Sequence, residues 1–529
     1  MKLRTSLKLT VGALALIAVT VGGTADAKSL RIGSQADAGT MDPQAQNIQT
    51  TISVLSMMYE ALITRDHDLV KVPALAESWE NISPTVWRFN LRPDVKFHDG
   101  SAFGADDVAF SIGRSKEETS QFSNFVASIT DVTVVDDLTV DITTAQADPL
   151  LLDKLGYILI MDRDWAEANN VQKPQNLTDQ EASYSVLHAN GTGPFSLDRR
   201  EPDSKTVLRR NDDYWGKIAG DFDEIVFTPI SSDPTRVAAL VSGELDLIID
   251  VPSQDVARLE TNPDVKISKT DEFRTLFFGM DQGSDVLKYG DAGASNPFKD
   301  IRVRQAMNMA IDAKTITRAV MRGLATPTGQ ILAPGNLGYD ASLDERVPFD
   351  PEAARALLTK AGYPDGFSVT LDCPNNRYIN DEPICKAVAT MLTQVGIDIS
   401  LNLMPRAQYF PKLWERDTSM FLMGFNSPYF DGMYALETLL MTRDDDAGSG
   451  IYNYSNYSDP ELDAEVVALR STVEQDERNA RMQALYRRVT EDVAYLPLHH
   501  QVLVFASRNN VNAPVRPDNW LEIRWVTMD

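Results

Sequence analysis

The stretch from Leu75 to Arg114 reads LAESWENISPTVWRFNLRPDVKFHDGSAFGADDVAFSIGR. Apolar and polar residues alternate around Trp87 and Phe89, which is the period of a half-buried strand. A Pro-Asp pair then forms a turn, and acidic residues precede an apolar stretch from Val108 to Ile112, as at the start of a helix. The residues alone therefore predict a strand, a turn and a helix with a structural role.

Further motifs follow along the chain. They are NGTGPF (190–195), LRRNDDYWG (208–216), DPTRVAALVSGELDL (233–247), IRVRQAMNMAIDAKTITRAVMRG (301–323) and DPEAARALLTKAGY (350–363). Together with the first stretch, and in this order, they resemble the signature blocks of the family 5 solute-binding proteins. These proteins are the extracytoplasmic receptors of peptide, opine and nickel ABC importers. The motifs cover nearly the whole mature chain, so the resemblance is specific.

The resemblance implies an α/β fold of the bilobal periplasmic binding protein kind (type II-like) with an extra inserted domain. Such a protein closes on its ligand by hinge motion. The first lobe would comprise residues 28–61, 187–272 and 491–529, the inserted domain residues 62–186, and the second lobe residues 273–490.

Local patterns predict several elements. Residues 30–33 read as a strand, and residues 132–142 alternate on both sides of Asp136-Asp137, as in a hairpin. Asp350 can cap a helix that has Pro351 in its first turn and Gly362 just past its end. Another helix opens at residues 458–460 by the same logic, and apolar residues at helical spacing (482, 485, 486 and 489) predict a core helix.

The N-terminus has the three-part form of a secretory signal peptide. Basic residues precede an apolar stretch from Leu9 to Val21, and Ala25-Asp26-Ala27 fits an A-x-A cleavage site. Cleavage before Lys28 would release the mature chain, most simply into a Gram-negative periplasm. The alternative, a membrane anchor, is disfavoured because the apolar run is short for a spanning helix.

The net charge of the chain is −26 at pH 7. This charge argues against nucleic acid and anionic membrane surfaces as partners. It does not indicate a cationic substrate, because a solvated acidic surface explains it as well.

The two cysteines of the chain, Cys373 and Cys385, lie twelve residues apart. In an oxidising compartment this spacing predicts one local disulfide. A metal site is the alternative, but no His lies nearby and the spacing is not that of a zinc pair.

The ligand site can be approached through the resemblance. In peptide-binding relatives, a turn in the second lobe supplies an aspartate that pairs with the α-ammonium of the ligand. The matching segment here is GFNSPYFDGM (424–433), and Pro428 occupies the aspartate position. Asp431 could substitute, or it could be a turn-forming residue before Gly432.

Arg377 aligns with an arginine that meets the ligand carboxylate in dipeptide-type relatives. A guanidinium suits this task because it can bind a carboxylate through two parallel hydrogen bonds. The alternative is a salt bridge within the protein, to Asp381 or Glu382. Further candidates for the pocket are Tyr378, Trp414, Phe425, Asn426 and Tyr429, with Arg406 as a weaker candidate cation.

The sequence disfavours two other functions and leaves a third open. Nickel-chelate binding is disfavoured because none of the five His residues (67, 98, 188, 499 and 500) is arranged as spaced ligands on one face. A hydrolase is disfavoured because the chain lacks nucleophile-elbow, P-loop, H-E-x-x-H and G-x-G-x-x-G motifs. A receptor that presents its ligand to a chemosensor, or that acts as a holdase, would share the same fold.

The sequence thus predicts a monomeric periplasmic receptor of an ABC importer, with no catalytic residue, metal or cofactor. Its ligand would be a peptide or peptide-like solute, such as a dipeptide, an oligopeptide, an opine or another sugar–amino-acid conjugate. The receptor would deliver this ligand to a membrane permease that separate ATPase subunits drive.

Overall fold

The computed structural model describes residues 28–177, 182–445, 447–472 and 474–529. The predicted signal peptide, residues 1–27, lies outside these ranges. Within the described ranges, no helix is both long and apolar enough to cross a membrane.

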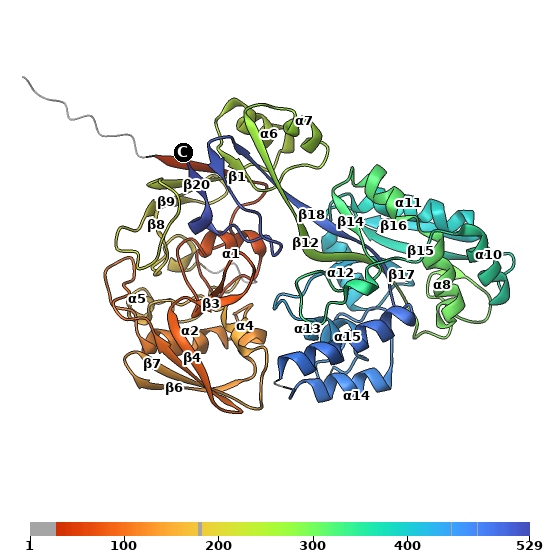
Figure 1. Ribbon diagram of the computed structural model, residues 1–529, viewed down its shortest axis with the longest axis horizontal. Coiled ribbons are helices and arrows are strands. Elements are labelled where there is room, and N and C mark those ends of the chain that lie inside the picture. Colours follow the sequence, from red (N-terminus) through yellow and green to blue (C-terminus); the bar gives the residue numbers. More distant parts are fainter. Residues whose placement is uncertain (1–27, 178–181, 446, 473) are drawn as a thin grey trace, which may run out of the picture.

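A sheet of 12 strands runs through the molecule (Figure 1). On one side, β1 (Ser29–Ser34) lies parallel to β10 (Glu224–Pro229) and β11 (Leu247–Ile248). The antiparallel strands β9 (Lys205–Arg210) and β8 (Phe195–Glu201) extend this side. We refer to the part built on these strands as the first lobe.

The second lobe is built on the other side of the same sheet. There β15 (Phe367–Pro374) lies parallel to β16 (Ile397–Met404) and β17 (Met420–Phe425). The short strands β13 (Gly290–Asp291) and β14 (Ala325–Pro327) pair with β15 and β18.

Two long strands belong to both lobes. β12 (Val265–Met280) and β18 (Leu496–Arg508) pair antiparallel along most of their length. β18 also pairs with β11, and β12 also pairs with β17, so these two strands join the lobes, and Figure 1 shows them running between the two halves. Their register shifts between Asp271 and Thr275, where the ladder is irregular.

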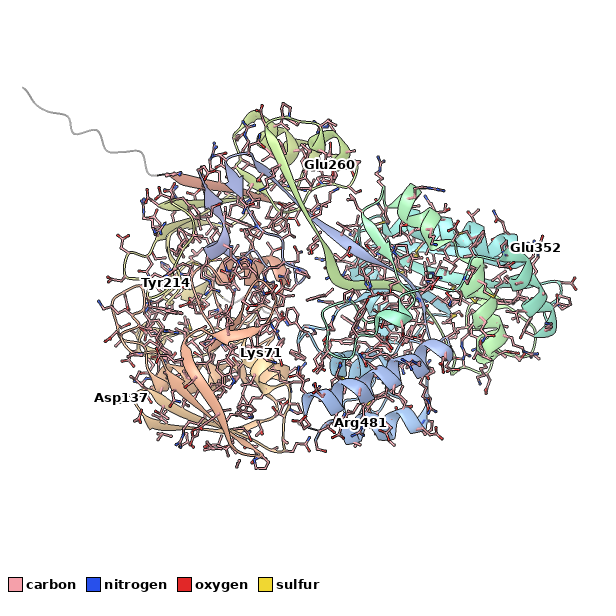
Figure 2. All side chains as sticks on the ribbon, viewed as in Figure 1. Lys71, Asp137, Tyr214, Glu260, Glu352 and Arg481 are labelled. Carbon is pink, nitrogen blue, oxygen red and sulfur yellow. A yellow bond between two sulfur atoms is a disulfide. The ribbon has the colours of Figure 1, made fainter. Side chains whose placement is uncertain are left out.

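A separate four-stranded sheet forms the core of the third part of the chain, which we call the inserted domain. Its order is β4 (Ala76–Ser83), β5 (Val86–Leu91), β7 (Thr139–Thr144) and β6 (Ile129–Asp136). The hairpin β2 (Ile63–Arg65) and β3 (Lys71–Pro73) precedes it. Figure 2 shows Lys71 on the inner side of this domain, toward the second lobe, and Asp137 on its outer side.

Helices flank these sheets. Those of the first lobe and inserted domain are α1 (Gln49–Leu55), α2 (Ala105–Ser115), α3 (Ser123–Val126), α4 (Leu151–Leu155), α5 (Arg163–Ala168), α6 (Asp233–Ser242) and α7 (Val256–Glu260). Those of the second lobe are α8 (Ile301–Ala310), α9 (Ala313–Thr315), α10 (Pro351–Lys360), α11 (Asp381–Gln394), α12 (Arg406–Trp414), α13 (Met433–Ala435), α14 (Pro460–Leu469) and α15 (Gln475–Glu491). The short strands β19 (Val511–Asn512) and β20 (Thr527–Met528) pair near the C-terminus.

The local predictions are confirmed. The expected strand is β1, the expected hairpin is β6–β7, and the apolar stripe lies buried on α15. Asp350 caps α10 by accepting hydrogen bonds from two N–H groups of its first turn, and Asp459 caps α14 in the same way. Gly362, just past α10, has a φ of +100°, which a residue with a Cβ rarely adopts.

Several motif residues meet at the buried carboxylate of Glu60. Thr192 of NGTGPF and both aromatic residues of the DYW motif, Tyr214 and Trp215, donate hydrogen bonds of 2.8–3.0 Å to it. Burial raises the pKa of Glu60, and these donors, together with the charge of Arg524, oppose that rise. These motifs therefore hold the first lobe together.

The exact boundaries between the lobes remain predictions from the sequence. Leu496 and Leu498 of β18 lie in the same apolar core as α8 and α11 of the second lobe. The strand therefore crosses from the second lobe to the first after these residues.

Cys373, at the end of β15, forms a disulfide with Cys385 of α11, and both are fully buried. The bond closes a loop with a sequence separation of 12 residues. This loop contains Arg377 and Tyr378, so the disulfide ties both ends of a cavity-lining segment.

We expect the double substitution Cys373→Ala/Cys385→Ala to lower the free energy of unfolding by roughly 3 kcal/mol. Without the disulfide the unfolded chain has more conformations, and for a loop of this size the added entropy stabilises the unfolded state by about that amount. Melting temperatures by circular dichroism, with and without dithiothreitol, test this. Dithiothreitol should lower the melting temperature of the wild type and leave the variant unchanged. Equal melting temperatures for the two oxidised proteins would contradict the expectation.

His499 of β18 is fully buried, and neither ring nitrogen has a hydrogen-bond partner among the described residues. Burial, with the neighbouring His500 and Arg346, lowers the pKa of His499 to about 3. The unfolded chain binds a proton near pH 6.5, whereas the folded chain does not. The free energy of unfolding is therefore unaffected by His499 above pH 6.5, and it decreases as the pH falls from 6.5 toward 3.

At pH 5 this loss amounts to about 2 kcal/mol. We therefore expect His499→Leu to show a smaller drop in melting temperature between pH 7 and pH 5 than the wild type. The exposed His188 provides the matched control, since His188→Leu should keep the wild-type drop. The same drop in all three proteins would show that His499 does not contribute.

Candidate ligand-binding cleft

A cavity of about 440 Å³ lies between the two lobes. Its walls come from residues 249–254 of the first lobe, residues 376–380 of the second lobe and residues 501–504 of β18. The first two segments follow β11 and β15, each at the carboxyl end of a strand with a parallel neighbour, β1 for β11 and β16 for β15. Ligands of open α/β sheets bind at this edge.

Arg377 and Tyr378 line the cavity from the second lobe. They precede α11, and Asp381 of that helix accepts hydrogen bonds from both of their backbone N–H groups, at 2.8 and 3.1 Å. Glu382 pairs instead with Lys386. Neither acid therefore forms the salt bridge that was the alternative role for Arg377.

The guanidinium of Arg377 has no carboxylate within 4 Å in the described part of the chain, and its carbon lies 5.0 Å from the centre of the Tyr378 ring. Burial and the nearby charges of Arg274 and Arg406 lower the pKa of Arg377 from its usual value. An arginine nevertheless stays charged at neutral pH. The cavity therefore holds a positive charge that is not neutralised by an ion pair.

The two strands that join the lobes supply further donors. Arg274 of β12 forms an ion pair of 3.3 Å with Glu272, and its buried Nε has no partner among the described residues. Gln501 of β18 is 1% exposed, and its Nε2 also has no partner in the described structure. A buried donor without an acceptor is costly. These groups can bind carbonyl or carboxylate oxygens of a ligand.

Asp250 lines the opposite wall. Its Oδ2 accepts hydrogen bonds of 2.9 Å from the Ser34 hydroxyl and from the backbone N–H of Gln35. Both donors stand at the end of β1, beside β11. These hydrogen bonds fix the carboxylate at the carboxyl ends of the parallel strands β1 and β11.

The second lobe contacts both the first lobe and the inserted domain. Asn380 of the second lobe donates a hydrogen bond of 3.4 Å to Ser253 of the first lobe. The Tyr157 hydroxyl of the inserted domain donates a hydrogen bond to the Pro428 carbonyl of the second lobe. The Arg65 guanidinium lies 3.9 Å from the centre of the Phe430 ring. The cavity thus lies between parts that are far apart in sequence.

The family 5 model of bacterial extracellular solute-binding proteins ("family 5 Middle") matches residues 71–446. The chain belongs to this family. It is also 25% identical over 501 residues to the glutathione-binding protein GsiB of Salmonella paratyphi A, with 93% of each chain covered. The recognition made from the sequence motifs is therefore confirmed.

Solved structures agree on the fold. CtaP, an ABC transporter substrate-binding protein of Listeria monocytogenes, superposes with a TM-score of 0.81 at 21% identity, over 95% of this chain and 99% of its own. A dipeptide-binding protein of Pseudoalteromonas sp. SM9913, solved with Met-Leu, gives 0.75 at 21% identity, over 95% and 100%. The family 5 chain therefore has the predicted bilobal α/β fold.

In this family 5 protein, the structure gives Asp431 a role other than ligand binding. Asp431 is 4% exposed and forms a two-bond ion pair with the buried Arg478 of α15. It also accepts a hydrogen bond of 2.8 Å from the N–H of Met433. The sequence left two roles open for Asp431; its bond to the Met433 N–H is that of a turn-forming residue, and its charge is already matched inside the protein by Arg478.

The other predicted residues lie outside the cavity lining. Trp414 is 57% exposed at the end of α12. Phe425 stacks on Tyr434 in the core, and Tyr429 packs against Phe125 of the inserted domain with ring centres 5.5 Å apart. Asn426 is exposed, and Arg406 begins α12. These aromatic residues serve packing or the contact between the second lobe and the inserted domain.

The sequence did not point to Asp250, Arg274 or Gln501. One signal was available for Asp250, since an acid directly after the apolar run Leu247–Ile249 marks the carboxyl end of a strand. No such signal exists for Gln501, which lies within a continuous strand. No cluster of three or more metal-ligating side chains occurs within the described ranges.

We expect Asp431→Asn to lower the free energy of unfolding by about 3–5 kcal/mol, because it leaves the buried Arg478 without a counter-charge. Glu461→Gln is the control, since it removes an acid from an exposed ion pair with Arg488, and it should leave the melting temperature nearly unchanged. Thermal unfolding of both variants tests this. Wild-type stability of Asp431→Asn would contradict the structural role.

Proposed function

We propose that this protein is a periplasmic receptor that binds a peptide or peptide-like solute and delivers it to an ABC permease. It acts as a monomer and as a binding protein without enzymatic activity. The observation that carries the proposal is the Arg377 guanidinium, which lines the cavity between the lobes and has no carboxylate partner among the described residues. A charge placed in this way needs an anionic group from outside the protein.

The carboxylate of the ligand binds Arg377, and the unpaired donors of Arg274 and Gln501 bind its carbonyl oxygens. The lobes then close over the ligand by bending the strands that connect them. The relatives named for glutathione support this class of ligand. Opines and other amino-acid conjugates carry the same carboxylate and belong to the same class.

The ligand class can be read directly from the protein as exported by its own cell. Native mass spectrometry of protein purified gently from the periplasm, followed by fragmentation of the released molecule, identifies what it carries. Short peptides, or a conjugate of an amino acid, support the proposal. A ligand without a carboxylate or a metal complex would contradict it.

We expect Arg377→Ala to weaken binding by at least about tenfold, because one charge-assisted hydrogen bond to a buried carboxylate is worth about 1.5–3 kcal/mol. Isothermal titration with glutathione and with Met-Leu measures the affinity. The melting temperature of the ligand-free variant should change little, since the guanidinium makes no ion pair in the described structure. Arg406→Ala, at the nearby start of α12, is the matched control and should keep the wild-type affinity.

An unchanged affinity of Arg377→Ala would remove this residue from the site. Equal losses in the two arginine variants would point to a general effect of positive charge. The salt dependence of binding separates these cases, because a buried ion pair is screened less than an exposed charge.

A further inference from the structure

Six charged side chains line the cavity, and four of them are paired with each other. On the first lobe, Arg236 forms an ion pair of 2.7 Å with Asp233. On β12, Arg274 forms one of 3.3 Å with Glu272. In each pair the arginine and the acid balance each other's charge, so neither pair requires a charged ligand group.

The two remaining charges are opposite in sign and lie on opposite lobes. Arg377 stands on the second lobe and Asp250 on the first. Within the described ranges, neither forms an ion pair with any other residue, and they do not pair with each other within 4 Å. The space between them is part of the cavity, so a ligand can lie between the two charges.

The carboxylate of Asp250 is placed to receive a cation. Its Oδ2 is occupied by the Ser34 hydroxyl and the Gln35 N–H, whereas its Oδ1 accepts no hydrogen bond in the described structure. The side chain is half-buried, so that it is partly withdrawn from water but reachable from the cavity. The two local donors fix its orientation, which lowers the entropy cost of binding.

The amine-binding position expected from relatives offers no alternative. Pro428 has no charge, and its carbonyl accepts the hydrogen bond from Tyr157. Asp431 is neutralised by Arg478. Among the carboxylates that line the cavity, Asp250 therefore remains as the one without a cation in the described part of the chain.

We propose that Asp250 binds the cationic group of the ligand, the ammonium of a peptide or an amino-acid conjugate, while Arg377 binds its carboxylate. This inference rests on the proposed function and specifies the ligand as a zwitterion. Such a ligand joins the two lobes through its two ends, so that each charged contact is complete only when the lobes are together. Closure and recognition of the zwitterion are then the same event.

The test uses the mature full-length protein and two pairs of probes. Glutathione and Met-Leu each carry a free ammonium, and their N-acetylated forms lack it. We expect the wild type to bind each free probe at least about tenfold more tightly than its acetylated form, measured by isothermal titration. Asp250→Asn should lose at least about tenfold in affinity for the free probes and should no longer distinguish the two forms.

Asp255→Asn is the matched control. Asp255 lies on the same segment, outside the cavity lining, in an ion pair of 2.8 Å with Arg258. It should keep the wild-type affinity and the wild-type preference for the free amine. Asn at position 250 retains an oxygen that can accept the hydrogen bonds from Ser34 and Gln35, and the melting temperature of the ligand-free variant verifies its fold.

The affinities of the wild type and of Asp250→Asn for the four probes test the role of Asp250. If the wild type binds the free probes and their acetylated forms equally, Asp250 does not recognise an amine, and this holds even where Asp250→Asn fails to fold. If Asp250→Asn keeps wild-type affinity or discrimination, the inference is also overturned, while the proposed function stands through the effect of Arg377→Ala. If the wild type binds none of the four probes, the proposed function and this inference both fail for peptides.

Discussion

The pairing of β12 with β18 is the constraint on which the rest of the molecule depends. Both lobes share one sheet because these two strands run through it, and neither lobe has a sheet that is complete without them. A hinge motion must therefore bend the strands rather than separate two independent bodies. The register shift after Asp271 marks a place where the ladder is already interrupted and bends more easily.

The position of the cavity follows from this connection. The first lobe and the second lobe each direct the carboxyl ends of parallel strands toward the strands between them, and loops at these ends are free to carry polar side chains. Asp250 and Arg377 come from such ends, whereas Arg274 and Gln501 come from the connecting strands themselves. The proposed ligand site thus includes the strands that connect the lobes. In the proposed mechanism, the same strands bind the ligand and bend.

The sequence predicted features that depend on near neighbours, such as the capping of α10 by Asp350, the hairpin β6–β7 and the disulfide loop. It also placed Arg377 in the cleft, because the family motifs fixed the register of that segment. It left the role of Asp431 open between amine binding and a turn, since its partner Arg478 is 47 residues away and no local pattern indicates such a pair. Asp250 was missed for the same reason, because the cavity joins segments whose proximity is set by the tertiary fold.

The contact between Tyr157 and Pro428 joins the inserted domain directly to the second lobe. The Tyr157 hydroxyl binds the Pro428 carbonyl, so the inserted domain holds the second lobe directly, without a ligand between them. In a hinge motion this bond would form when the cleft closes and break when it opens. The observed affinity of a receptor is its intrinsic affinity multiplied by the fraction of molecules already in the competent state. In such a motion the bond between Tyr157 and Pro428 would raise the fraction of molecules in the closed state, and with it the observed affinity, although both residues lie outside the cavity lining.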